Sequence, residues 1–289
     1  MHRRDLASLA ALATLALTVG VGCPEDKPAG TTGGAKPAQT AKPTAAVTAT
    51  ATSTGAAAPG KEGPMGTASI KGAVNFTGKA PEMKVPKKRK DADFCKTKEV
   101  KYNAVVVNNG KLAETLVRLT NDSVKGEYKA PDKHAEIDQV DCMYAPRIQG
   151  VVAGQEIDIK NADGTLHNVH TFKGNETWFN QAQPKGSVAI SKELEDTKLI
   201  KFVCDVHPWM RGFVVVSSHP FFAVSGADGT FAIEKVPAGK YTIEAWHPHY
   251  GQKTAQIEVA DGKAVEQNFT YDGTEQEPIE NKDELKDLF

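Results

Sequence analysis

The sequence lacks an excess of charge of either sign. Its 289 residues include 35 lysines and arginines against 36 aspartates and glutamates, for a formal net charge of −1. A general nucleic-acid binder usually carries a basic excess, so this balance argues against nucleic acid as a partner. The charged fraction of 25% and the mean hydropathy of −0.40 exclude a polytopic membrane protein.

Cysteine and helical periodicity are also scarce. Four cysteines in a chain of this length are too few for a scaffold built on disulfides. No segment repeats its apolar residues at the helical period for more than a turn or two. Short alternating runs separated by Asn-Gly, Asp-Gly and Ala-Gly turns follow from Ala68 onward instead. This pattern predicts an all-β protein made of sandwiches or barrels.

The N-terminus has the pattern of an export signal. Arg3 and Arg4 precede an apolar run over 6–21 that is too short to span a bilayer. The small residues before Cys23 resemble the lipobox of bacterial lipoproteins, although Gly20 stands where a leucine-like residue is usual. The resemblance implies a signal peptide over 1–22, a lipid on Cys23 and a place in the bacterial cell envelope, as a periplasmic or outer-membrane lipoprotein. Plain signal cleavage is the alternative.

Two segments lack the composition of a folded domain. Residues 23–66 consist mainly of Ala, Thr, Pro and Gly and contain almost no large apolar side chains. Such a stretch cannot bury enough surface to offset its ordering entropy, so we expect an extended, disordered spacer. Residues 273–289 are expected to form an acidic, frayed tail.

The rest of the chain is predicted to form two β-domains, over 67–217 and 218–272. The turns at 228–231 and 236–241 resemble those of carboxypeptidase regulatory-like and transthyretin-like domains, which implies a small β-sandwich at the C-terminus. This second domain is short to stand alone. The alternative is a discontinuous sandwich in which residues 68–80 join 218–272.

Two motifs contain residues able to bind a metal. Cys204, His207 and Met210 stand in one short segment after an apolar run, and His167 follows an earlier run. A thiolate, two imidazoles and a weak thioether form the ligand set of copper electron-transfer sites. The same set is a poor match for common zinc sites. Packing in a β core without any metal is the remaining alternative.

The spacing Cys204-x-x-His207-x-x-Met210, with His167-Asn168 upstream, resembles the cupredoxins, and amicyanin-like members most. The resemblance implies a Greek-key β-sandwich with one type 1 (blue) copper per chain. It makes His167, Cys204 and His207 the equatorial ligands and Met210 the axial ligand.

The resemblance also implies roles for three neighbours of the ligands. Asn168 would pin the loop of His167. Pro208 and Trp209 would form an apolar rim around a partly exposed His207, through which electrons would pass.

These assignments leave two cysteines. If Cys23 is lipidated and Cys204 binds copper, Cys95 and Cys142 remain, and in an exported protein they are expected to form a disulfide. Two free buried thiols are the alternative.

Three further features have ordinary interpretations. His170 is expected to be a core or surface histidine rather than a ligand. His247 and His249 form a strand-end pair, with a second copper site as the alternative. The basic run 86–90 is expected to be a solvated loop, with docking to an acidic partner as the alternative.

The sequence therefore predicts a membrane-tethered protein that transfers single electrons to an unidentified redox partner. We expect no enzymatic activity, because one mononuclear site with four protein ligands leaves no position for a substrate. The alternatives are a copper protein for storage, delivery or sensing, and a structural or glycan-binding β-sandwich lipoprotein.

Overall fold

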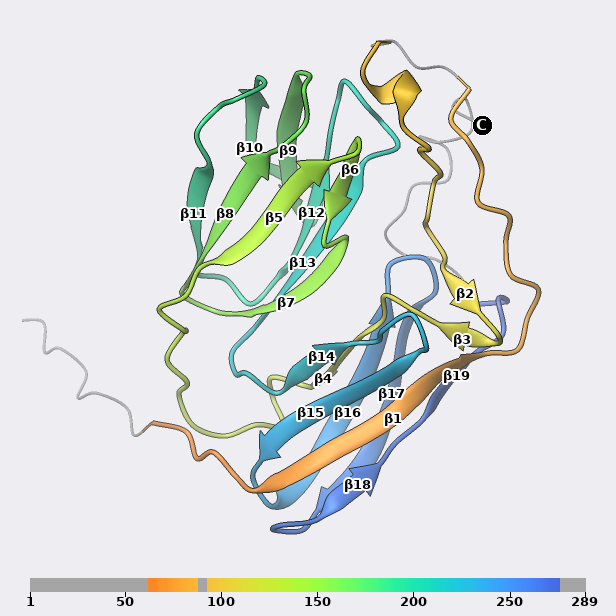
Figure 1. The fold of residues 1–289 in the computed structure, drawn as a ribbon. Helices are drawn as coiled ribbons and strands as arrows, with labels where there is room; N and C mark the ends of the chain where they lie inside the picture. The colour runs from red at the N-terminus through yellow and green to blue at the C-terminus, as the bar shows by residue number, and fades with distance from the viewer. Residues whose placement is uncertain (1–61, 88–92, 276–289) are drawn as a thin grey trace, which may run out of the picture. The chain divides into compact units, whose positions relative to one another are not determined.

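A computed structural model describes residues 62–87 and 93–275 (Figure 1). The predicted signal peptide, the predicted lipidation site Cys23 and the predicted linker up to residue 61 lie outside the described residues. Residues 88–90 of the basic run and 276–289 of the predicted tail lie outside them as well. Within the described part of the chain, no helix is long and apolar enough to cross a membrane.

The prediction of an all-β protein is confirmed. The one helix among the described residues is a short 3-10 turn, η1 (Cys95–Thr97). The strands form four sheets of six, five, four and four strands. Two of these sheets contain all the strands between Ala135 and Ser217. We call this pair of sheets the site lobe. The other two form the C-terminal lobe (Figure 1).

The site lobe is a sandwich of two sheets around one core. One sheet has the strand order β10-β9-β12-β13-β7 and the other has the order β11-β8-β5-β6. Ile137 from one sheet and Phe202 and Val214 from the other are fully buried in the same cluster. The strands are β5 (Ala135–Val140), β6 (Met143–Ala145), β7 (Ile148–Val152), β8 (Gln155–Asn161), β9 (His167–Lys173), β10 (Glu176–Gln183), β11 (Ile190–Leu194), β12 (Leu199–Val203) and β13 (Arg211–Ser217).

The C-terminal lobe has the alternation that the sequence predicts. In β15, Phe231 and Ile233 are buried while Ala232 between them is exposed, as expected of a strand with one face on the core. Its strands are β1 (Ala68–Phe76), β2 (Val107–Asn108), β3 (Lys111–Leu112), β4 (Leu116–Leu119), β14 (Phe222–Val224), β15 (Thr230–Val236), β16 (Gly239–His247), β17 (Gly251–Val259), β18 (Ala264–Glu266) and β19 (Phe269–Tyr271).

The predicted division at residue 217 is corrected by the position of β1. This strand pairs antiparallel with β15 and parallel with both β18 and β19. These three strands pair with β1 rather than with one another, so the C-terminal residues cannot complete this sheet alone. β4 likewise lies between β14 and β16. The structure has the discontinuous sandwich that the sequence left as the alternative, but it also includes β2, β3 and β4 from residues 107–119, which neither predicted division assigned to it.

The predicted linker also ends earlier than residue 66. The Gly63 amide donates to the Glu127 carbonyl at 2.6 Å, and the Gly66 amide donates to the Lys235 carbonyl at 2.8 Å. These bonds tie Gly63 and Gly66 to later parts of the chain, so the last residues of the predicted linker belong to the folded structure.

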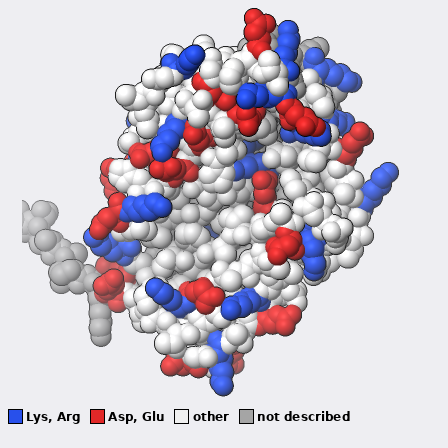
Figure 2. Space-filling model, viewed as in Figure 1, with Lys and Arg blue, Asp and Glu red and all other residues white. Residues whose placement is uncertain are grey.

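Surface charges are mixed, as the near-zero net charge predicts. On the face shown in Figure 2, lysines and arginines are interspersed with aspartates and glutamates. Some of the charged residues at the surface form exposed ion pairs, such as Lys160 with Glu136. The electrostatic field of the whole protein therefore does not favour partners of one charge. Any charge complementarity to a partner has to come from local groups of residues.

Candidate metal centre

The predicted ligands are brought together by strand pairing. His167 is the first residue of β9, and Cys204 directly follows the last residue of β12. These strands are antiparallel neighbours, with Val203 opposite His170. The start of β9 therefore lies beside the end of β12. This register brings together His167 and Cys204, which are 37 residues apart in sequence.

The donor atoms of three residues converge in a buried cluster. The Nδ1 atoms of His167 and His207 are 2.8 Å apart. The Cys204 Sγ atom lies 3.5 Å from His207 Nδ1 and 3.9 Å from His167 Nδ1. Both imidazoles are 0% exposed and the cysteine is 1% exposed. One sulfur and two nitrogens that meet this closely can share a single metal ion.

The surroundings of Cys204 favour the thiolate, which is the form that binds metals. Burial by itself opposes ionisation, but contacts from His167, His207 and the Asn168 amide outweigh it and lower the pKa of Cys204 to about 6. The Asn168 amide donates to the sulfur at 3.5 Å. A thiolate is therefore available near neutral pH.

Asp163 is a site residue that the sequence analysis missed. Its Oδ2 atom lies 2.9 Å from His167 Nε2, on the side of the ring opposite the cluster. A hydrogen bond from Nε2 to this carboxylate fixes the tautomer and leaves the Nδ1 lone pair for a metal. Burial by itself would lower the pKa of His167, but Asp163 and Cys204 raise it to about 9, so at neutral pH a metal has to displace the Nδ1 proton. In the sequence, the Asp163-Gly164 pair indicates only a turn. The feature that could have pointed to a contact is the position of Asp163, four residues before His167.

Asn168 ties the two halves of the site together. Its Oδ1 atom accepts the Asp205 amide at 2.7 Å and the Val206 amide at 3.3 Å. Its Nδ2 atom donates to Asn180 and to the Asp205 carboxylate. The side chain therefore fastens the loop after Cys204 to the start of β9.

Met210 belongs to the same loop. Its backbone amide donates to the His207 carbonyl at 2.9 Å, which closes the loop between β12 and β13. Its side chain is fully buried in the core of the site lobe. A buried thioether in the same loop as Cys204 and His207 is the kind of weak donor that the axial position of a copper site takes.

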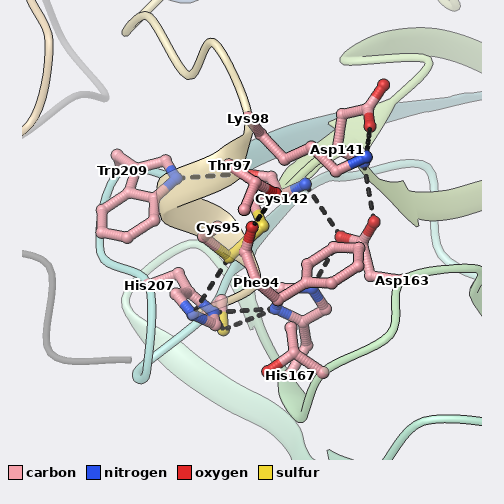
Figure 3. Close-up of a disulfide and its surroundings, with 12 residues drawn as sticks. Phe94, Cys95, Thr97, Lys98, Asp141, Cys142, Asp163, His167, His207 and Trp209 are labelled. Carbon is pink, nitrogen blue, oxygen red and sulfur yellow. Dashed lines mark hydrogen bonds and ion pairs between the residues drawn. A yellow bond between two sulfur atoms is a disulfide. The ribbon is translucent and has the colours of Figure 1, made fainter. Parts of the chain in front are cut away.

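The predicted disulfide between Cys95 and Cys142 is present, and it lies against the donor cluster (Figure 3). The Cys95 Sγ atom is 3.6 Å from His207 Nε2. The Cys142 amide donates to Asp163 at 2.8 Å, so the other half of the disulfide supports His167 indirectly. We call η1 and this disulfide the cap.

The cap corrects one prediction about His207. This residue was expected to be partly exposed behind a rim of Pro208 and Trp209, but both His207 and Trp209 are 0% exposed. The Trp209 indole donates to the Cys142 carbonyl at 3.0 Å, beneath the cap (Figure 3). Of these three residues, Pro208 is the one that is half-buried rather than buried. The cause is a segment more than 100 residues earlier in the chain, which no local spacing around His207 could indicate.

The comparisons with known proteins concern both lobes. Residues 213–272 match the family model of the carboxypeptidase regulatory-like domain. That match confirms the predicted resemblance of the C-terminal strands. No curated protein matches the chain.

Similar solved structures include cupredoxins. A purple cupredoxin from Nitrosopumilus maritimus is 24% identical over 29% of this chain and 99% of its own, with a TM-score of 0.26. A Cu(I) form of an amicyanin variant is 23% identical over 30% of this chain and 85% of its own, with a TM-score of 0.27. A copper-containing nitrite reductase from Thermus scotoductus SA-01 is 16% identical over 34% of this chain and 25% of its own, with a TM-score of 0.28.

The remaining histidines of the described residues do not join the cluster. His170 lies 3.0 Å from Asp205 and 2.9 Å from Thr177 through its two ring nitrogens. His247 is fully buried in the C-terminal lobe, where its Nδ1 atom accepts the His249 amide. Among the described residues, neither His247 nor His249 belongs to a group of three close donor side chains.

Proposed function

We propose that this protein is a copper-binding electron carrier with a cupredoxin-like site lobe. The observation that carries the proposal is the convergence of Cys204 Sγ with the Nδ1 atoms of His167 and His207 in a fully buried cluster. Met210, buried in the same loop, would complete the set.

The donor chemistry fits copper better than other common metals. A thiolate suits Cu(I), and imidazoles suit both oxidation states of copper. Structural zinc sites use four ligands that include at least two cysteines and no thioether. The set here has one cysteine, two histidines and a thioether. The lowered pKa of Cys204 makes the thiolate available at neutral pH. We assign one type 1 copper to each chain.

Copper in such a site supplies one-electron chemistry by alternating between Cu(I) and Cu(II). The protein would contribute a donor cage that does not rearrange. Asp163 fixes the ring of His167, Asn168 fixes the loop after Cys204, and the cap covers His207. Full burial of the donors leaves no room for a substrate, which favours a carrier over an enzyme.

The proposed location is the bacterial cell envelope, with a lipid on Cys23 and the segment up to residue 61 as a tether. The disulfide of the cap supports this proposal, because such bonds persist in oxidising compartments. The C-terminal lobe would act as a spacer or docking module.

The test is a titration of the full chain with Cu(II), followed by visible absorption. We expect an intense thiolate-to-copper band that saturates at one copper per chain and disappears in Cys204→Ser. Met210→Leu is the matched variant: it should keep the band and change the reduction potential, because the axial ligand tunes the potential. A colourless protein at saturation would contradict the proposal.

One observation favours a second function, in copper storage or delivery. The cap covers His207 completely, which blocks the usual approach to such a site. A copper-loaded chain that fails to exchange electrons reversibly with small redox mediators would support storage over electron transfer.

A further inference from the structure

The coverage of His207 raises the question of where a redox partner could approach the site. On the side of the cap, a shallow hollow is lined by residues such as Pro86, Lys87 and Lys96. No donor residue of the site lines this hollow. A different, open hollow of about 410 Å³ includes Cys204 in its wall, together with Pro208 and Arg211. Of the four proposed ligands, Cys204 is the one that lines either of these two hollows, although it is 1% exposed.

This hollow continues into a second one. The neighbouring hollow, of about 470 Å³, shares Phe172, Gly174, Asn175 and Lys201 with the first. Together they form a groove along β12 and the turn between β9 and β10, which we call the lysine groove. Lys173, Lys198 and Lys201 line it. The Lys201 ammonium lies 4.9 Å from the centre of the Phe172 ring, so the groove presents a cation beside an aromatic ring.

The groove has an excess of positive charge. Lys173 and Lys198 share a single carboxylate, that of Asp196, at 3.1 and 3.8 Å. Asp196 is not among the residues that line the groove, and Asp205 is the one acidic residue that is. Its carboxylate is already engaged by His170, Asn168 and Asn180.

We propose that the lysine groove is the docking surface for an acidic redox partner protein, with electrons exchanged on the Cys204 side of the site. This inference rests on the proposed function. Carboxylates of the partner would face Lys198 and Lys201, and local charge complementarity would increase the rate of encounter. In each transfer one electron passes between the copper and the partner's redox group, so one is oxidised as the other is reduced.

The test uses the copper-loaded full chain in its reduced form and two small oxidants of opposite charge. Hexacyanoferrate(III) is an anionic probe that takes one electron and becomes hexacyanoferrate(II). Tris(phenanthroline)cobalt(III) is a cationic probe that takes one electron in the same way. For the double variant Lys198→Glu/Lys201→Glu at low ionic strength, we expect about 10-fold slower oxidation by the anion and faster oxidation by the cation. Added salt should reduce both effects.

The matched control is Lys87→Glu/Lys96→Glu, beside the cap. It changes the net charge by the same amount, so a smaller effect on both probes would assign the approach to the lysine groove. An equal or larger effect would overturn the inference and place the approach at the cap. The glutamine versions of both pairs, checked by their visible band, separate charge effects from misfolding. Absence of the band in the unmodified chain would overturn the proposed function itself, and the inference with it.

Discussion

Two pairs of fully buried histidines, one in each lobe, differ in their partners. In the site lobe, His167 contacts the Asp163 carboxylate, and His207 lies between the sulfurs of Cys204 and Cys95. In the C-terminal lobe, the Nδ1 atoms of His219 and His247 each accept a backbone amide. Their Nε2 atoms have no hydrogen-bond partner among the described residues.

The difference shows that equally buried histidines can have very different surroundings. His219 and His247 pack against aromatic rings such as Phe221 and Tyr250, and burial lowers the pKa of both. They stay neutral and act as parts of the core. The site lobe surrounds its histidines with a carboxylate and a thiolate instead. Those partners fix which nitrogen faces the cluster, as metal binding requires.

Removal of the disulfide of the cap should have the largest effect on the site lobe, because the disulfide covers His207. The disulfide closes a loop of 47 residues, so the double variant Cys95→Ser/Cys142→Ser should lose about 4 kcal/mol of unfolding free energy in the chain-entropy model. Urea denaturation measures this loss. Reaction of His207 with diethylpyrocarbonate should appear in the variant and be absent from the oxidised parent chain. Unchanged stability and unchanged protection would show that the cap does not hold His207.

Asp163→Asn should weaken the site without unfolding the lobe. The amide no longer favours the tautomer that leaves His167 Nδ1 free, so copper affinity should fall about 10- to 100-fold. Competition with a copper chelator measures the affinity. Asp138→Asn is the control, because Asp138 accepts the Ala162 amide of the same turn but makes no contact with His167. Equal affinities for the two variants would contradict the role of Asp163.

Acid should destabilise the C-terminal lobe through His219. Burial and then the charge of Arg118 lower the pKa of His219 to about 4, against about 6.5 in an unfolded chain. Above about pH 6.5 neither state binds the proton, and as the pH falls toward 4 only the unfolded chain takes it up. Stability should therefore fall over this window, by about 2 kcal/mol at pH 5.

His219→Phe isolates this effect. The variant should lose about 2 kcal/mol less than the parent chain between pH 7 and pH 5 in urea denaturation. Identical pH dependence in the two chains would mean that His219 is protonated in the folded state.

The smallest effect is expected at His247. His247→Phe should leave the copper stoichiometry and the visible band unchanged, because His247 and His249 belong to no group of three close donors among the described residues. Metal analysis of the purified variant gives the stoichiometry. A loss of bound copper would mean that the C-terminal lobe contains a second site.

Local patterns in the sequence were enough for part of the site. The spacing of Cys204, His207 and Met210 places three side chains on one loop. His167 begins β9, the strand that pairs with β12 beside this loop. The even number of remaining cysteines indicated the Cys95–Cys142 pair, which the structure confirms. The sequence around Asp163 predicts only a turn. Its contact with His167 depends on the conformation of that turn in the folded protein.

The amino-acid sequence by itself determined the all-β character, the C-terminal family resemblance and the set of candidate ligands, because strand alternation, turn chemistry and ligand spacing are all short-range. Only the tertiary structure decided that β1 completes the C-terminal lobe and that the cap buries His207. Both join segments more than 100 residues apart. Such contacts form because sheet edges and buried polar groups need partners, and that need leaves no local signal along the chain.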